Sequence, residues 1–229
     1  MHYWLVMPAA GSGQRFGGAL PKQYQRLAGR AIIEWALAPF LADSRCVGIR
    51  VALAADDRQF AQLPAACDPR LRAVRGGARR ADSVAAGIAA CQMQQDDWVL
   101  VHDAARPCLT SEELDGLLAA AVPGCDGALL ALPLTDTLKR AGSDGQVQCT
   151  EPREHLWRAL TPQMFRAGML TRALEDAAAA GRTPTDEAQA VEWLGHVSVL
   201  VAGSALNIKV TTPADLALAE AILRLRGGG

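Results

Sequence analysis

The chain has 229 residues, of which 50% are hydrophobic and 21% are charged, and its formal net charge is −1 at pH 7. This length is enough to bury a core without disulfides or structural metals, and the near-zero charge excludes an overall field that would attract nucleic acid or an anionic membrane. Any binding of anions must therefore be local.

Short apolar runs alternate along the chain with alanine-rich stretches of helical periodicity. This alternation predicts an α/β fold in which helices cover both faces of a mostly parallel sheet. No repeat, linker or change in composition divides residues 1–226, so we expect one domain, followed by a frayed tail at 227–229. In chain order, the expected strands are 3–7, 47–54, 71–77, 98–107, 127–134, 196–203 and 207–210, and the expected helices are 31–41, 57–63, 82–93, 111–122, 169–181, 186–195 and 213–226.

Several of the expected helices begin with residues that suit an N-cap. Asp82 and Ser83 open the helix 82–93, and Ser111 opens the helix 111–122. Their side-chain oxygens can accept hydrogen bonds from the first free N–H groups of a helix. The last helix combines Thr212 as cap with Pro213, which is favoured at the first helical position.

Residues 135–154 differ in character from the rest of the chain. They are polar, centre on the sequence GSDG, and show no helical periodicity. Such a turn favours chain reversal, so the segment predicts a β-hairpin arm that projects from the domain. Because an isolated hairpin is only marginally stable in water, we expect it to pack against something else, and a second subunit is the economical partner.

The cysteines and the N-terminal residues bear on the compartment. The six cysteines are scattered and contain no C-x-x-C pair, so we expect reduced structural thiols rather than a zinc site. Residues 3–7 lack a basic flank and are too short for a signal peptide. No apolar run approaches the roughly 20 residues that a membrane span needs, and we expect a cytoplasmic protein.

The stretch PAAGSGQRFGGALPK, residues 8–22, follows the first expected strand. It does not match the dinucleotide fingerprint, because Phe16 stands where the third glycine is required. It does not match a Walker loop either, because Lys22 lies between Pro21 and Gln23 rather than after a glycine.

The same stretch nevertheless has the properties of an anion site. Gly11 and Gly13 would let the backbone approach a ligand closely, and Arg15 and Lys22 add positive charge. These features predict a site for a nucleotide triphosphate. The structural alternative is a plain glycine-rich turn with solvated cations.

Eight strings occur in a characteristic order along nearly the whole chain: PAAGSGQRF, PKQY, GGARRADSV, VHDAARP, DTLKR, LTPQMF, TDEA and NIKVT. In order and spacing they resemble the 2-C-methyl-D-erythritol 4-phosphate cytidylyltransferases of the non-mevalonate isoprenoid pathway. The resemblance implies a Rossmann-like nucleotidyltransferase fold, CTP as substrate, a divalent cation, usually Mg²⁺, and a homodimer in which the 135–154 arm reaches the neighbouring site. The implied reaction transfers a cytidylyl group from CTP to methylerythritol phosphate and releases pyrophosphate.

The resemblance also implies roles for individual residues. The catalytic residues would be Arg15, Lys22, Arg153 and Lys209. The residues that bind CTP would be Pro8, Ala9, Ala10, Gly11, Gly13, Arg15, Lys22, Gly77, Ser83, Asp103 and Ala104. The polyol phosphate would contact Asp103, Arg106, Thr137, Arg153, Thr161, Thr185 and Lys209. Asp103 is the one candidate metal ligand, with most of the coordination supplied by phosphates.

Some of these residues have a structural alternative. Lys22 could be a surface lysine, Ser83 only an N-cap, and Thr185 a cap before the helix that begins at Asp186. Asp103 could be a structural acid paired with Arg106.

Two rival functions also remain. A ribitol-5-phosphate cytidylyltransferase shares the CTP loop but takes another polyol phosphate, and VHDAARP and TDEA favour methylerythritol phosphate over it. A nucleotide-binding protein without catalysis would be free to lose the four catalytic cations. Two residues, Phe16 and Ala78, depart from the usual family pattern, and Ala78 puts one contact to the base in doubt.

Overall fold

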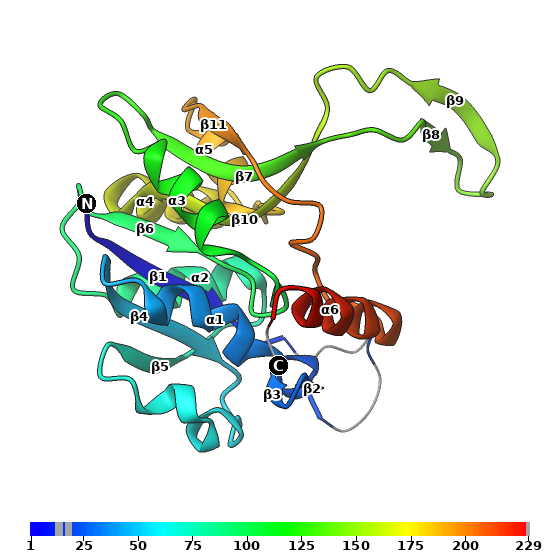
Figure 1. Ribbon diagram of the computed structural model, residues 1–229. Helices are drawn as coiled ribbons and strands as arrows, with labels where there is room; N and C mark the ends of the chain where they lie inside the picture. Colours follow the sequence, from blue (N-terminus) through cyan, green and yellow to red (C-terminus); the bar gives the residue numbers. More distant parts are fainter. Residues whose placement is uncertain (12–15, 17–19, 228–229) are drawn as a thin grey trace.

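The computed structural model describes residues 1–11, 16 and 20–227. Within these residues the main sheet has seven strands in the order β11-β7-β10-β6-β1-β4-β5 (Figure 1). Their bounds are β1 Tyr3–Pro8, β4 Cys46–Leu53, β5 Leu71–Arg75, β6 Trp98–Val101, β7 Gly127–Pro133, β10 Trp157–Arg166 and β11 Ser198–Ala202. Neighbouring strands run parallel except for β10, which is antiparallel to both β6 and β7. The mostly parallel α/β fold is confirmed, whereas β10 was not predicted.

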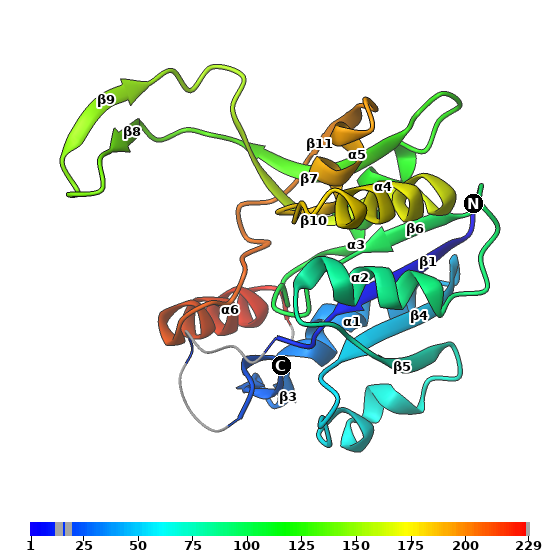
Figure 2. The same ribbon diagram turned by 180° about the vertical axis from the view of Figure 1, so that it is seen from behind.

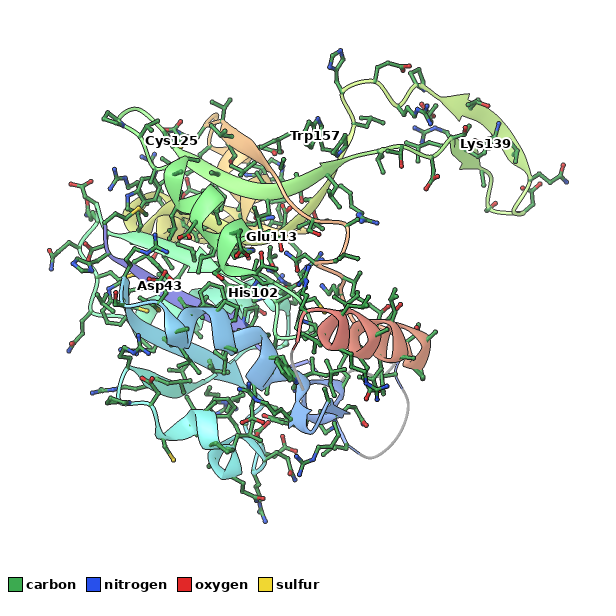
Figure 3. The ribbon with its side chains drawn as sticks, in the orientation of Figure 1. Asp43, His102, Glu113, Cys125, Lys139 and Trp157 are labelled. Carbon is green, nitrogen blue, oxygen red and sulfur yellow. The ribbon has the colours of Figure 1, made fainter. Side chains whose placement is uncertain are left out.

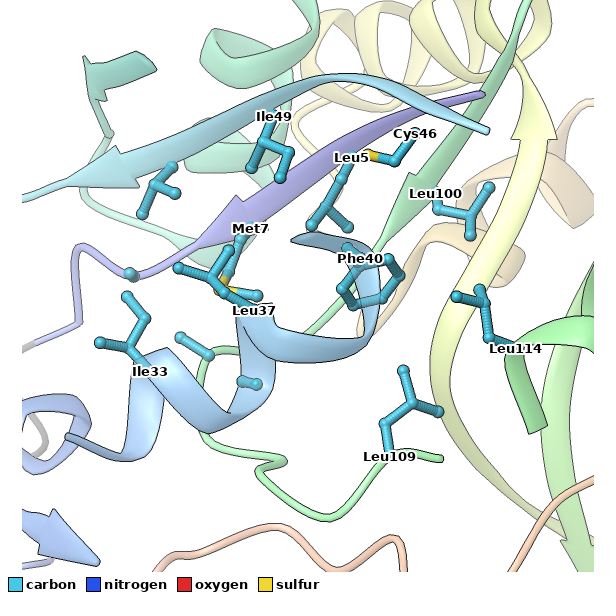
Figure 4. Close-up of a cluster of buried hydrophobic side chains, with 14 of the residues drawn as sticks. Leu5, Met7, Ile33, Leu37, Phe40, Cys46, Ile49, Leu100, Leu109 and Leu114 are labelled. Atoms are coloured by element: carbon cyan, nitrogen blue, oxygen red, sulfur yellow. The ribbon is translucent and has the colours of Figure 1, made fainter. Parts of the chain in front are cut away.

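Helices cover both faces of the sheet, as Figures 1 and 2 show from opposite sides. Side chains of the first strand, β1, point alternately to the two faces, so both faces need a cover. Leu5 and Met7 pack in one core, and Val6 packs in the other. Figure 4 shows the first core, where Leu37 and Phe40 of the covering helix meet the sheet. The helices on that face are α1 Ile32–Ala42 and α3 Ser111–Ala119, and those on the other are α2 Arg80–Ala89, α4 Ala167–Ala179 and α5 Glu187–Trp193.

The last helix, α6 Pro213–Leu225, lies beside the main body and not over the centre of the sheet (Figure 1). Its apolar residues pack with Leu27, Ile32 and Cys108. Leu27 belongs to the short hairpin formed by β2 Arg26–Leu27 and β3 Arg30–Ala31. Residues 227–229 follow this helix, and Gly228 and Gly229 lie outside the described residues, so the expected tail stays a prediction.

Two expected elements are wrong. The helix expected at 57–63 is replaced by two short 3₁₀ turns, η3 Phe60–Gln62 and η4 Pro64–Cys67. Pro64 disfavours a helical conformation at the preceding residue, and Leu63 is extended, which separates the two short turns. The strand expected at 207–210 does not form, because the segment leaves the sheet and bonds to the loop after β6 through Val210 N–H and the Ala105 carbonyl, at 2.8 Å.

Three of the expected helix caps are also wrong, although α3 does begin at Ser111 as expected. Helix α2 begins at Arg80, ahead of the expected cap pair. Thr110 caps α3 by accepting from the Glu113 N–H at 3.2 Å, and Asp186 caps α5, which leaves neither Ser111 nor Thr185 as a cap. The Thr212 cap of α6 is confirmed.

The expected arm is present as a separate antiparallel hairpin. It consists of β8 Leu138–Ala141 and β9 Val147–Glu151, which pair with each other and not with the main sheet. Both views show it extending away from the body (Figures 1 and 2). Most residues of its two strands are exposed, and the expectation that a second subunit covers the arm stays a prediction.

The remaining expectations concern thiols and membranes. All six cysteines are free, and Cys67 and Cys149 are the exposed ones. In the part of the chain that the structure describes, no helix is both long and apolar enough to cross a bilayer.

The packing of α2 on β1 gives a test of the fold. A Cβ on Gly87 would lie 2.4 Å from Val6 Cγ1, so Gly87→Ala forces the helix and the strand apart. We expect it to lower the free energy of unfolding in urea by about 1–3 kcal/mol. Gly116→Ala in α3 is the matched control: its Cβ would meet Val201 only at 3.9 Å, and we expect a gain of about 0.5–1 kcal/mol from helix propensity. Equal effects of the two substitutions would contradict this packing.

Candidate active site

The carboxyl ends of three parallel strands open into one pocket. Strands β1, β5 and β6 end at Pro8, Arg75 and Val101 on the same edge of the sheet, which is where open α/β sheets bind ligands. The pocket has a volume of about 420 Å³. It is lined by Pro8, Ala9, Ala10, Gly11, Lys22, Gln23, Gly77, Ala78, Arg79, Arg80, Ser83, Asp103, Ala104, Ala105, Lys209 and Thr211.

The structure brings together most of the residues predicted for the nucleotide. The predicted residues that line the pocket are Pro8, Ala9, Ala10, Gly11, Lys22, Gly77, Ser83, Asp103, Ala104 and Lys209. Two predicted residues, Gly13 and Arg15, lie outside the described residues. Five others do not line the pocket: Arg106, Thr137, Arg153, Thr161 and Thr185.

Asp103, at the start of the turn that follows β6, is the electrostatic centre of the pocket. The residue is only 7% exposed, and both oxygens of its carboxylate face cations. Oδ1 lies 3.0 Å from Arg80 Nε, and Oδ2 lies 2.7 Å from Lys209 Nζ and 3.7 Å from Arg106 Nε. The expected pairing with Arg106 is therefore present, but it is the longest of three.

These charges decide the protonation state of Asp103. Burial alone would raise the pKa of its carboxyl, but the nearby positive charges of Arg80 and Lys209 outweigh burial and hold that pKa well below its usual range. The carboxylate is therefore ionised at any pH at which the protein works. Among the described residues, no group of three or more His, Cys, Asp or Glu side chains could hold a metal ion.

His102 and Thr161 fix the backbone beneath Asp103. His102 Nε2 lies 3.1 Å from the Arg106 carbonyl, which can only accept, so Nε2 carries the proton. Nδ1 then accepts the hydroxyl proton of Thr161 at 2.9 Å, and the Thr161 oxygen accepts from the Asp103 N–H at 3.1 Å. Thr161 is buried and its proton is committed, so it supports Asp103 from below.

A second buried contact ties this layer to the segment after β11. Arg106 Nη1 donates to the Asn207 carbonyl at 2.8 Å, and Asn207 Nδ2 donates to the Thr161 carbonyl at 3.0 Å. Asn207 thus holds the chain just before Lys209 against the floor of the pocket. This explains how Lys209 faces the pocket although the expected strand at 207–210 does not form.

Lys22 reaches the same segment from the other side of the pocket. It opens the short turn η2 Lys22–Tyr24, and its Nζ donates to the Val210 carbonyl at 3.1 Å. Lys22 therefore bonds to Val210, the residue that follows Lys209 in the segment after β11. The structural alternative of a plain surface lysine does not describe Lys22, which lines the pocket.

The loop backbones around the nucleotide side are already held by hydrogen bonds. Ala9 N–H donates to the Ala52 carbonyl at 2.7 Å, and its carbonyl accepts from Gln23 Nε2 at 2.9 Å. Gly77 N–H donates to Ser83 Oγ at 3.1 Å. Ser83 is therefore not the N-cap of α2, and it braces the glycine turn at the pocket rim.

The predicted residues on the arm lie apart from this pocket. Thr137 and Arg153 belong to the segments that flank the hairpin, and Arg153 donates to the Thr135 carbonyl at the base of the arm. Figure 3 shows how far the arm residue Lys139 lies from His102 in the body. Thr185 precedes α5, and its N–H donates to Gln189 Oε1 at 2.8 Å.

Three residues of the site were missed from the sequence as functional residues. Arg80, Glu187 and His102 stand inside the quoted strings GGARRADSV, TDEA and VHDAARP, but their types and spacing did not distinguish them from surface charges or a packed histidine. Arg80 and Glu187 meet across 107 positions of sequence, with Nη1 of Arg80 2.6 Å from Oε1 of Glu187. Only the fold brings them together.

The buried histidine gives a pH test of this layer. Burial lowers the pKa of His102 from 6.5 to about 4, so between these values the unfolded chain binds the extra proton and stability falls as pH falls. From pH 7.5 to pH 5 this linkage removes about 2 kcal/mol of unfolding free energy. We expect His102→Gln, which keeps a donor and an acceptor, to be less stable at pH 7.5 but to lose about 2 kcal/mol less over this range in denaturant titrations. An unchanged pH dependence would contradict a buried neutral His102.

Comparison with known proteins agrees with this geometry. A family model described as 2-C-methyl-D-erythritol 4-phosphate cytidylyltransferase matches residues 3–225. A relative of that name from Ectopseudomonas mendocina is 52% identical over 218 residues, which cover 94% of this chain and 93% of the relative. Another from Xanthomonas campestris pv. campestris is 51% identical over 98% of this chain and 86% of its own length.

Solved structures agree over the whole fold. A crystal structure of 4-diphosphocytidyl-2C-methyl-D-erythritol synthase superposes with a TM-score of 0.84 at 36% identity, covering 97% of this chain and 98% of that one. The Francisella tularensis 2-C-methyl-D-erythritol 4-phosphate cytidylyltransferase gives 0.82 at 30% identity, covering 97% and 100%. The pocket at the carboxyl edge, the arm and these matches together place this chain in the 2-C-methyl-D-erythritol 4-phosphate cytidylyltransferase family.

Proposed function

We propose that this protein transfers the cytidylyl group of CTP to 2-C-methyl-D-erythritol 4-phosphate, giving 4-diphosphocytidyl-2-C-methyl-D-erythritol and pyrophosphate for isoprenoid precursor synthesis. The observation that carries the proposal is the pocket that Lys22, Lys209 and the buried Asp103 line together, with Lys209 Nζ 2.7 Å from Asp103 Oδ2. The names and near-complete coverage of the relatives support the same reaction, and none of the relatives named above is a ribitol phosphate enzyme.

The chemistry needs no side-chain nucleophile. A phosphate oxygen of methylerythritol phosphate bonds to the α-phosphorus of CTP, the bond from that phosphorus to the oxygen bridging the β-phosphorus breaks, and its electron pair leaves with pyrophosphate. The attacking phosphate is already anionic near neutral pH. The protein must instead hold two anions in line and compensate the charge that spreads over the phosphate oxygens. This agrees with His102 being neutral, buried and fully bonded rather than a general base.

Lys22 lines the pocket and would bind the triphosphate. Its ammonium would leave the Val210 carbonyl for phosphate oxygens, which are far stronger acceptors for a cation. Arg15 would add a planar fork from the glycine-rich loop. Ala10 and Gly11, at the end of β1, leave room for the ribose and the base.

Lys209 is the cation on the polyol phosphate side. Its side chain is 38% exposed and its ammonium already faces the pocket, where Asp103 holds it at 2.7 Å. A phosphate that approaches from the open side can bind the ammonium without displacing this carboxylate, because three N–H donors are available. Asp103 and Arg106 would then orient the hydroxyl groups of the polyol.

We propose that Mg²⁺ enters as part of the CTP substrate. Asp103 is a poor direct ligand in its observed state, because Arg80 and Lys209 already occupy its two oxygens. Mg²⁺ binds readily through phosphate oxygens and waters with few protein ligands. When bound, the ion would neutralise part of the triphosphate charge, while Lys22 and Lys209 would position the two substrates.

We further propose a homodimer in which the arm completes the neighbouring site. Thr137 and Arg153, implied as contacts to the polyol phosphate, belong to the arm region that extends away from its own pocket (Figure 2). A partner related by two-fold symmetry would bring each arm to the other subunit's pocket. A cytoplasmic location suits the six free thiols.

The cations of the pocket give the first kinetic test. In an assay that follows pyrophosphate release with CTP, Mg²⁺ and methylerythritol phosphate, we expect Lys22→Ala and Arg15→Ala to lower kcat by about 10²–10³, because each stabilises developing charge. Arg153→Ala should mainly raise KM for the polyol phosphate. Arg26→Ala, an exposed cation near Lys22, serves as control and should stay within about twofold. Wild-type release with ribitol 5-phosphate but not methylerythritol phosphate would overturn the proposed substrate.

Mixed dimers test whether the arm acts across the interface. Lys22→Ala is defective in the body and Arg153→Ala in the arm, so a mixed dimer has one site with an intact body and an intact partner arm. After unfolding and refolding an equal mixture, half of the dimers are mixed and about a quarter of the sites are intact. At a polyol phosphate concentration far below the KM of Arg153→Ala, where that variant has little activity, we therefore expect about a quarter of wild-type activity. Activity no higher than the mean of the two variants would show that Arg153 does not act in trans.

A further inference from the structure

Glu187 is a buried acid at the start of α5 that none of the roles above uses. It is 1% exposed, and it lies behind the pocket wall rather than among the residues that line it. Its helix and α2 cover the same face of the sheet (Figure 2). A fully buried carboxylate is costly unless it is paired, so its partner is the key to its role.

The partner of Glu187 is Arg80 of α2. Glu187 Oε1 lies 2.6 Å from Arg80 Nη1, and Oε2 lies 3.0 Å from Nη2. This two-pronged pairing uses one N–H of each terminal nitrogen and fixes the orientation of the guanidinium, so that its contact with Asp103 is made through Nε, at 3.0 Å from Oδ1. Asp103 Oδ2 is thereby left to Lys209, at 2.7 Å. Four charges of alternating sign thus run from α5 to the pocket.

The position of Glu187 is itself fixed by neighbouring contacts. Gln163 on β10 donates from Nε2 to Asp186 Oδ2 at 2.9 Å and accepts from the Ala188 N–H at 3.0 Å. Asp186 also caps the helix by accepting from the Gln189 N–H at 3.0 Å. The residues on both sides of Glu187 are therefore held, and its carboxylate cannot follow Arg80 if Arg80 moves.

Arg80 and Lys209 both bind the carboxylate of Asp103, one at each oxygen. A guanidinium prefers to bind both oxygens of a carboxylate in parallel, and Arg80 could turn to do so at Asp103 if Glu187 did not hold its guanidinium. Such a pairing would bring Arg80 to Oδ2 in competition with Lys209. We propose that Glu187 is a positioning residue that occupies the fork of Arg80, so that Asp103 keeps one oxygen for Lys209 and holds its ammonium in place for the polyol phosphate.

The kinetic test rests on the proposed function and uses Glu187→Gln, which keeps the shape but removes the charge. We expect kcat/KM for methylerythritol phosphate to fall at least tenfold while KM for CTP changes less than twofold, since Lys22 and the nucleotide loop are not involved. The control is Glu192→Gln, an exposed glutamate on the same helix, with both constants unchanged. Equal losses for the two substrates, or no loss, would contradict the proposal.

A second variant separates positioning from general support of the fold. If Glu187 acts only through Arg80, its removal matters little once Arg80 can no longer compete for Asp103. In an Arg80→Met background, Glu187→Gln should therefore change kcat/KM for the polyol phosphate by less than twofold. A full tenfold loss in that background would show that Glu187 acts by another route.

A readout without substrates keeps this inference apart from the proposed activity. Acylation of Lys209 by an amine-reactive reagent, followed by mass spectrometry of its peptide, should be at least threefold faster in Glu187→Gln, because the ammonium has lost its carboxylate partner. Exposed Lys139 on the arm serves as internal reference. An unchanged rate at Lys209 would overturn the positioning role, whereas a wild-type protein that releases no pyrophosphate would overturn only the proposed function.

Discussion

The site depends on one buried carboxylate that is surrounded by cations. Asp103 is ionised because Arg80, Lys209 and Arg106 lie within 3.7 Å of its oxygens, and those cations stay at the pocket because Asp103 is there. Such a cluster compensates its own charge before any substrate arrives. It can therefore hold ammonium and guanidinium groups at fixed positions without the repulsion that several unpaired cations would create.

The fold supplies this cluster by topology more than by local sequence. Parallel strands β1, β5 and β6 place their carboxyl ends on one edge, and the antiparallel β10 adds Thr161 beneath Asp103. Apolar runs and helical periodicity in the sequence were enough to predict the α/β class, and the polar GSDG turn was enough to predict the arm. They could not predict β10, because Pro162 interrupts its pattern and lies where the pairing with β7 shifts register between Ala159 and Gln163.

The candidate site could be predicted only in part, for a similar reason. The glycine-rich loop, Lys22 and the string around Asp103 are local patterns, and among the described residues Gly11, Lys22 and Asp103 do line the pocket. The contacts that orient them are long-range: Arg80 with Glu187, His102 with Thr161, and Asn207 with Arg106. A buried ion pair and two surface charges look the same in a sequence, and only packing distinguishes them.

The most direct measurement is a crystal structure of the protein with CTP and the polyol phosphate bound. We expect the triphosphate to lie beside Gly11 with Lys22 on its oxygens, the second phosphate to lie on Lys209, and Asp103 to stay paired with Arg80 and Lys209. Phosphates bound away from these two lysines would contradict this expectation, and so would an Asp103 that Arg80 and Lys209 no longer contact.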